Sequence, residues 1–177
     1  MTVVGYTIRK AAPSDLPSLP DIEREAASLF ASRLAELGFN PDGPVQVNSI
    51  ETLSSAQESG RVWVALDFLN QPVGFALVVE IDGLAHLEEM DVLPSHGRQG
   101  LGTALLETVC AWAKESGYSA VTLSTFRDVP WNAPFYGRNG FHAVEPAKFS
   151  HGLAQVVETE RRRGLRTDLR VIMRRDV

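Results

Sequence analysis

The chain has 177 residues, of which 44% are hydrophobic and 22% are charged, as is typical of a soluble globular protein. A chain of this length should bury roughly 70% of the surface that its unfolded form exposes, so we expect residues 1–177 to form a single domain. A net charge of -5 disfavours nucleic-acid binding, because phosphate contacts need clustered Lys and Arg, and no apolar run approaches the ~18 residues of a membrane span.

The N-terminal part of the sequence predicts a strand and two helices. Residues 4–10 read as a strand, and their early Arg-Lys pair is unlike a signal peptide, which favours a cytoplasmic protein. Residues 12–39 predict a single helix, because apolar residues recur on one face at helical spacing: Ile22, Ala26, Leu29, Phe30, Leu34 and Leu37. The sequence FNPDGP predicts a turn after this helix, and residues 49–59 predict a second, shorter helix.

The middle of the chain is rich in β-forming residues. The three runs are RVWVALDF at 61–68, PVGFALVVEI at 72–81 and LAHLEEMDVL at 84–93. Asp82 and Gly83 separate the last two runs and form one of the strongest short hairpin signals. We therefore expect an antiparallel meander.

The C-terminal part alternates between helices and strands. We expect helices at 103–115 and 150–163, strands at 118–126 and 169–175, and a short helix in WNAPFYGRNGF that Gly140 ends. A strand, helix and strand in this order imply a right-handed crossover with local parallel pairing. The sequence thus predicts an α+β fold with one mixed, mostly antiparallel sheet of about six or seven strands and helices on both faces.

Two further features of the sequence have unremarkable interpretations. The single cysteine, Cys110, cannot form an internal disulfide, and its apolar neighbours predict a place in the core. Arginines gather near the C-terminus, where a solvated helix end followed by a strand accounts for them, with a phosphate or partner patch as the alternative.

The sequence GRQGLG, at residues 97–102, lies where a strand gives way to a helix. A helix start presents about four unpaired N–H groups and roughly half a positive charge, which favours a phosphate. The glycines let the backbone approach such a ligand, and Arg98 and Gln99 offer further donors. A P-loop would need a lysine after Gly102, and a dinucleotide fingerprint would need glycine where Leu105 stands, so neither motif fits. An ordinary structural turn is the alternative interpretation.

Two stretches together resemble a known superfamily. MDVLPSHGRQGLGTALL resembles the acetyl-CoA-binding signature of the GNAT superfamily of N-acetyltransferases, in which Gln or Arg precedes two residues, Gly, one residue, and Gly or Ala. NAPFYGRNGF resembles its second hallmark, an Asn before a Tyr on a short helix that ends in Gly-Phe. One position departs from the pattern, because Gly97 stands where Gln or Arg is expected and Arg98 follows. The resemblance implies a GNAT-like fold whose glycine turn binds the CoA pyrophosphate through backbone N–H groups.

The resemblance also implies which residues bind acetyl-CoA. The spacing of the histidines matches no metal-binding pattern, so no metal is expected. The main chain of Asp91 and Val92 would pair with the pantetheine amides, and Asn132 would contact the pantetheine arm, although Asn is also a common helix N-cap. The hydroxyl of Tyr136 would protonate or stabilise the departing thiolate, and a buried aromatic is the alternative. The expected set is Asp91, Val92, Gly97, Arg98, Gln99, Gly100, Leu101, Gly102, Thr103, Asn132 and Tyr136.

Acetyl transfer to an amine also needs a base, because an alkyl amine with a pKa of about 10.4 is almost fully protonated at neutral pH. The candidates lie on one strand: His86, Glu88, Glu89 and Asp91. Alternation puts the first two on one face and the last two on the other, unless a bulge of the kind common in GNAT members intervenes. In the arylalkylamine acetyltransferases, a family within GNAT, two histidines align with His86 and Glu88. We expect Glu88 to be the base, assisted by His86, with Glu89 as its rival and solvated strand residues as the alternative.

Acidic and aromatic residues elsewhere suggest how a cationic amine would be recognised. An anionic, aromatic-walled mouth would be formed by Glu23, Glu25, Phe30, Trp63 and Trp131, unless these are a solvated face and core aromatics. The sequence thus predicts an acetyl-CoA-dependent N-acetyltransferase that acts on a small-molecule or protein amine by direct attack in a ternary complex. The alternatives are a CoA-binding sensor or interaction module, and nucleotide binding at the glycine turn. A monomer and a homodimer are both compatible with the resemblance.

Overall fold

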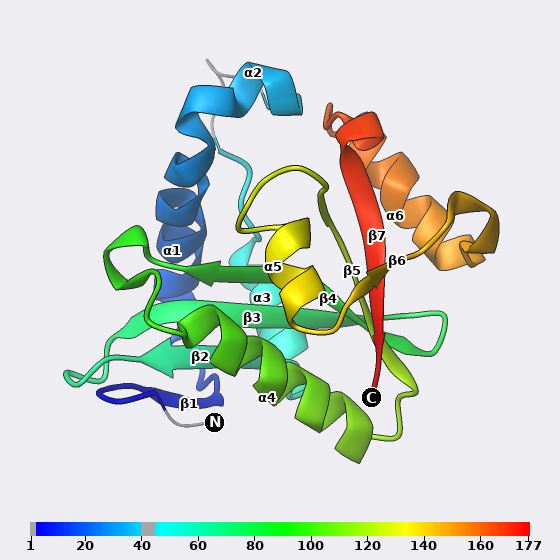
Figure 1. Cartoon of the computed structure of the whole chain (residues 1–177). Coiled ribbons are helices and arrows are strands. Elements are labelled where there is room, and N and C mark those ends of the chain that lie inside the picture. The colour runs from blue at the N-terminus through cyan, green and yellow to red at the C-terminus, as the bar shows by residue number, and fades with distance from the viewer. Residues whose placement is uncertain (1–2, 40–44) are drawn as a thin grey trace.

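The computed structural model describes residues 3–39 and 45–177, so the predicted turn FNPDGP lies outside the described residues apart from Phe39. Within them, one mixed sheet has the strand order β1-β2-β3-β4-β5-β7-β6 (Figure 1). The strands are β1 (Thr7–Lys10), β2 (Val62–Leu66), β3 (Pro72–Ile81), β4 (Leu84–Val92), β5 (Ala120–Phe126), β6 (His142–Ala143) and β7 (Arg170–Asp176). Neighbouring strands are antiparallel except β4 and β5, which are parallel, so the predicted α+β class is confirmed.

Helices cover both faces of this sheet, as predicted. They are α1 (Leu19–Ala26), α2 (Leu34–Leu37), α3 (Ile50–Glu58), α4 (Leu101–Glu115), α5 (Ala133–Arg138) and α6 (His151–Arg162). In Figure 1, α4 and α5 lie in front of the sheet, and α1 and α3 lie behind it. Leu105 and Val109 of α4 share a buried cluster with Leu87, whereas Ile22 of α1 shares another with Phe75. We call these two sides of the sheet the α4 face and the α1 face.

The long helix predicted for residues 12–39 is broken. Two 3-10 segments, Leu16–Ser18 and Ala27–Arg33, interrupt it, and α1 and α2 are the α-helical parts. A 3-10 helix turns every three residues rather than every 3.6, so the apolar stripe does not stay on one face. Ile22 is accordingly buried, whereas Leu29 is 44% exposed, and the prediction for Leu29 is wrong.

A β-bulge interrupts the pairing of β3 with β4. Leu77 pairs with Glu89 and the next residue, Val78, pairs with Leu87, so Glu88 is an extra residue in β4. The bulge reverses the alternation of side chains, because Leu87 before it and Met90 after it both pack on the α4 face. The ionisable side chains of β4 therefore all face α1: His86, Glu88, Glu89 and Asp91.

Strands β4 and β5 pair over only part of their length. Ala85–Leu87 pairs with Val121–Leu123, but β4 continues to Val92 and β5 continues to Phe126. Beyond Leu87 the two strands part. Among the described residues, the edge of β4 that faces β5 then has no strand partner, while its other edge stays paired with β3.

Candidate active site

The turn at residues 97–102 leads directly into α4, which begins at Leu101, slightly before the predicted start at 103. Arg98 and Gly100 have φ angles of 58° and 86°, and Gly100 is the N-cap of α4. No side chain of the described residues caps this helix end. The first N–H groups of α4 are therefore free to bind an anion, together with the positive end of the helix dipole.

A residue that the sequence analysis missed holds this turn. The Tyr6 hydroxyl donates to Gln99 Oε1 at 3.1 Å and lies 2.9 Å from Nδ1 of His96. The rings of Tyr6 and His96 also meet edge to face, with centroids 5.8 Å apart. Tyr6 precedes His96 by 90 residues and Gln99 by 93, so no local pattern in the sequence could have revealed the contact.

Acidic side chains of β4 meet Glu23 of α1 on the α1 face. Glu23 is buried and accepts hydrogen bonds from the backbone N–H of Asn48 at 2.9 Å and from its side-chain amide at 3.2 Å. Burial and, to a smaller extent, the charge of Glu23 raise the pKa of Asp91 to about 8. Burial also raises the pKa of Glu89 well above its usual value, and the charges of Asp91 and Glu23 add to the effect. Asp91 and Glu89 therefore tend to hold protons near neutral pH.

Glu88 and His86 lie at the bulge. The Glu88 side chain is 34% exposed, and its partial burial raises its pKa. His86 is only 2% exposed, and burial lowers its pKa to about 4, so its imidazole is neutral at pH 7. Its Nδ1 hydrogen-bonds the Thr122 hydroxyl at 2.9 Å, and its Nε2 lies 4.0 Å from Glu88 Oε2. That separation exceeds a hydrogen bond, so His86 can act on Glu88 only through a bridging water.

Helix α5 presents two predicted site residues next to the start of α4. Tyr136 is buried between Phe135 and Phe141, and burial raises its pKa, with Glu89 and Asp91 adding their charge, so its hydroxyl keeps its proton at neutral pH. Asn132 donates from Nδ2 to the Thr125 hydroxyl at 2.7 Å, while its buried Oδ1 has no hydrogen-bond partner among the described residues. This oxygen is free to accept a bond from a ligand.

The predicted CoA-binding residues thus lie in one region. Residues 97–103 form the turn and first residues of α4, Asp91 and Val92 lie in the part of β4 that β5 does not pair with, Asn132 is the N-cap of α5, and Tyr136 lies within α5. Residues 26–141 match the model of the acetyltransferase (GNAT) family. The chain belongs to the GNAT acetyltransferase family.

Solved structures share the fold over nearly the whole chain. An acetyltransferase of the GNAT family from Staphylococcus aureus Mu50 has a TM-score of 0.71 at 17% identity, covering 97% of this chain and 98% of that one. The ribosomal-protein-S18-alanine N-acetyltransferase from Escherichia coli has a TM-score of 0.65 at 21% identity, covering 97% and 94%. The PaiA N-acetyltransferase from Thermoplasma acidophilum, in complex with coenzyme A, has a TM-score of 0.65 at 18% identity, covering 97% and 99%.

In this GNAT acetyltransferase, the aromatic residues predicted for an acceptor mouth are divided between the two faces. Phe30 and Trp131 lie together, with ring centroids 5.7 Å apart, and Trp131 is 44% exposed. Trp63 is 3% exposed and packs against Trp112 of α4, so its predicted place in the mouth is wrong. Strand alternation explains the difference, because the neighbours of Trp63 in β2 face α1 while Trp63 faces α4. Glu25 is exposed on α1.

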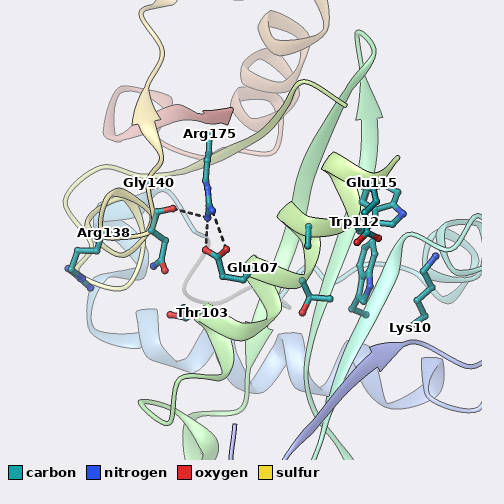
Figure 2. Close-up of a pocket in the computed structure, with 12 residues that line it drawn as sticks. Lys10, Thr103, Glu107, Trp112, Glu115, Arg138, Gly140 and Arg175 are labelled. Carbon is teal, nitrogen blue, oxygen red and sulfur yellow. Dashed lines mark hydrogen bonds and ion pairs between the residues drawn. The ribbon is translucent and has the colours of Figure 1, made fainter. Parts of the chain in front are cut away.

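A separate hollow crosses the outer side of α4 (Figure 2). Thr103 and Arg138 lie along it, so the hollow continues from the start of α4. Within it, Arg175 binds Glu107 through two hydrogen bonds and also donates to the Asn139 carbonyl at 3.1 Å, which ties α4 to β7 and to the end of α5.

Residues 3–39 and 45–177 of this GNAT acetyltransferase contain neither a candidate membrane span nor a candidate metal cluster. No helix in these ranges is long and apolar enough to cross a membrane. Nor do three or more His, Cys, Asp or Glu side chains in these ranges gather so as to hold a metal ion.

Proposed function

We propose that residues 1–177 form one N-acetyltransferase domain that moves the acetyl group of acetyl-CoA to a primary amine by direct attack in a ternary complex. The observation that carries this proposal is the gap between β4 and β5. Three features lie around this gap: the edge of β4 that β5 does not pair with, the uncapped start of α4, and the protonated hydroxyl of Tyr136.

The residues around the gap fit acetyl-CoA, which supplies the thioester when bound. The backbone N–H groups at 100–103, with the side chains of Arg98 and Gln99, would hold the pyrophosphate. The main chain of Asp91 and Val92, where β4 has no pairing with β5, would pair with the pantetheine amides as an added strand does. The unpartnered Oδ1 of Asn132 would accept a further amide N–H. Gly97 contributes no side chain, so the backbone carries most of this binding.

Glu88 would take the proton that the acceptor amine loses. An alkyl amine with a pKa of about 10.4 is only ~0.1% neutral at pH 7.4, which costs about 4 kcal/mol if no base assists. Glu88 is the more accessible of the two candidate glutamates, and its raised pKa brings it closer to the operating pH, where a general base works best. Glu89 is the rival, but its more strongly raised pKa favours its protonated form. His86, neutral and buried, would assist through water.

Tyr136 would act at the other end of the reaction. As the amine nitrogen bonds to the carbonyl carbon and the carbon–sulfur bond breaks, the hydroxyl of Tyr136 would donate its proton to the departing sulfur. Burial keeps that proton on Tyr136 until the negative charge develops.

We propose a cationic acceptor, bound on the α1 face. Glu23 and the carboxyls of β4 form an acidic group there, and a bound ammonium group would lower their raised pKa values and favour their ionised forms. Phe30 and Trp131 would line the approach, where aromatic faces attract a cation.

The role of Tyr136 is tested by Tyr136→Phe, which removes the hydroxyl and keeps the ring contacts. We expect kcat to fall by a factor of about 10² to 10⁴, as for loss of a general acid, while calorimetry shows nearly unchanged CoA binding. Tyr118→Phe is the control, because the Tyr118 hydroxyl binds Glu80 at the surface instead. An unchanged kcat in Tyr136→Phe would exclude Tyr136 as the acid.

The base and the reaction itself need separate measurements. The acidic limb of the pH profile of kcat/KM should disappear in Glu88→Gln and persist in Glu89→Gln; the reverse result would transfer the role to Glu89.

Mass spectrometry of the protein with acetyl-CoA and a panel of amines should reveal an acetylated product. If CoA binds and no amine is acetylated, the chain is instead a CoA-binding sensor. A thermal shift with ATP but none with CoA would favour nucleotide binding.

A further inference from the structure

Tyr6, His96 and Gln99 form a continuous hydrogen-bonded chain at the glycine turn. The Tyr6 hydroxyl lies 3.1 Å from Gln99 Oε1 and 2.9 Å from His96 Nδ1; Gln99 belongs to the turn, His96 immediately precedes it, and Tyr6 comes from the N-terminal segment. The edge-to-face packing of Tyr6 on His96, with ring planes at 84°, fixes the phenol relative to the imidazole. Tyr6 thus reaches the turn from the segment just before β1, the edge strand of the sheet.

The chemistry of the three groups sets the direction of this chain. A phenol has only one O–H, and the carbonyl oxygen of an amide can only accept, so the Tyr6 proton goes to Gln99 Oε1. The Tyr6 oxygen then accepts from His96, whose Nδ1 must carry the proton. Gln99 is consequently held with its oxygen toward Tyr6, and the two N–H bonds of its Nε2 point away from Tyr6.

The composition of the turn makes that orientation matter. Of residues 97–102, only Arg98 and Gln99 have side chains that can donate hydrogen bonds. Arg98 is exposed and has no hydrogen bond to another described residue through its side chain, so the structure does not hold it in one position. Gln99 is the donor whose orientation is fixed, and it lies one residue before the uncapped N-cap of α4.

We infer that Tyr6 and His96 are positioning residues, which orient Gln99 so that its amide N–H groups bind a phosphate of CoA beside the free start of α4. This inference rests on the proposed function, because it assumes that the turn receives the pyrophosphate. The oriented amide provides a donor in a turn whose first residue, Gly97, has no side chain. Pre-orientation strengthens binding because the complex then loses less side-chain freedom.

The test is Tyr6→Phe, which keeps the ring and removes only the hydroxyl. Loss of one hydrogen bond that orients a donor toward a charged group should raise the Kd for CoA about five- to tenfold. Calorimetry measures this Kd directly, and steady-state kinetics should show the loss in KM for acetyl-CoA rather than in kcat. Tyr118→Phe, which removes a surface hydroxyl bound to Glu80, is the matched control and should leave the Kd unchanged.

A double-mutant cycle separates positioning from general weakening of the fold. Gln99→Met removes the amide at similar length, and Tyr6→Phe added to Gln99→Met should have no further effect on the Kd, because no amide remains to orient. Equal Kd values for Tyr6→Phe and the unaltered protein, or independent effects in the cycle, would overturn the inference alone. If the unaltered protein binds no CoA, the proposed function fails as well.

Discussion

Replacing His86 with asparagine should make the folded protein less sensitive to acid. His86 is 2% exposed and burial lowers its pKa to about 4, whereas histidine in an unfolded chain has a pKa of about 6.5. Between these values the unfolded chain binds a proton that the folded protein does not accept, so acid favours unfolding. The destabilisation due to His86 is therefore absent above about pH 6.5 and grows as the pH falls toward about 4.

The size of the effect follows from the two pKa values. They differ by about 2.5, which at about 1.36 kcal/mol for each pKa unit sets an upper limit of about 3.4 kcal/mol. Between pH 7.5 and pH 5, His86 alone lowers the free energy of unfolding by about 2 kcal/mol. Asparagine does not titrate, and its amide can still hydrogen-bond the Thr122 hydroxyl that Nδ1 of His86 contacts. The free energy of unfolding of His86→Asn should thus fall about 2 kcal/mol less than that of the unaltered protein over this range.

Urea unfolding followed by tryptophan fluorescence at pH 7.5, 6 and 5 measures the difference. Comparison of the two proteins at each pH cancels the titration of the carboxyl groups that both share. His142→Gln, which removes an exposed histidine of β6, is the control that shows how loss of a surface histidine changes the pH dependence of the free energy of unfolding. If the unfolding free energies of His86→Asn and the unaltered protein fall in parallel from pH 7.5 to pH 5, His86 is not buried in its neutral form and the reasoning fails.

Two further predictions concern the turn and the core. Gly100→Ala should lower the free energy of unfolding by about 1 kcal/mol, because Gly100 has a φ of 86°. Gly102→Ala should change the free energy of unfolding by less, since a Cβ there would lie an ordinary 3.5 Å from the Phe135 ring. Equal losses of the two variants in urea unfolding would contradict this prediction. Cys110 is buried and its pKa is raised to about 11, so a thiol reagent at pH 8 should label it only in urea; rapid labelling of the folded protein would contradict its burial.

The parts of the fold that the sequence predicted are those set by local chemistry. Asp82 and Gly83 both have positive φ, as a type I′ hairpin requires, and they join β3 to β4 as expected. The glycine turn precedes α4, Asn132 is the N-cap of the short helix α5, and Tyr136 lies within that helix, because turn residues and helix ends are determined by neighbours in the chain. The prediction that Cys110 is buried is also confirmed.

The parts that escaped prediction depend on partners far away in the chain. The bulge at Glu88 exists only in the pairing of β4 with β3, so the sequence of β4 alone could not show that Glu88 and Glu89 share a face. Trp63 likewise lies apart from Trp131 because Trp63 takes the α4 face of β2, and the sequence of β2 alone does not show which face that is. No local sequence pattern could identify the role of Tyr6, because the hydrogen-bond partners of its hydroxyl lie about 90 residues further along the chain.

The bulge in β4 also determines which changes of length this strand can accept. Substitution at Glu88 alters one side chain, and deletion of Glu88 would restore simple alternation without exchanging the faces of the residues up to Val92, because Val78 would still pair with Leu87 and Leu77 with Glu89. Met90 would keep its place against the apolar cluster beneath α4, and Asp91 would still face α1. The bulge thus adds one carboxyl side chain to the α1 face without changing the face of any other residue of β4, and natural variation in this chain can alter or remove residue 88 without displacing Met90 or Asp91.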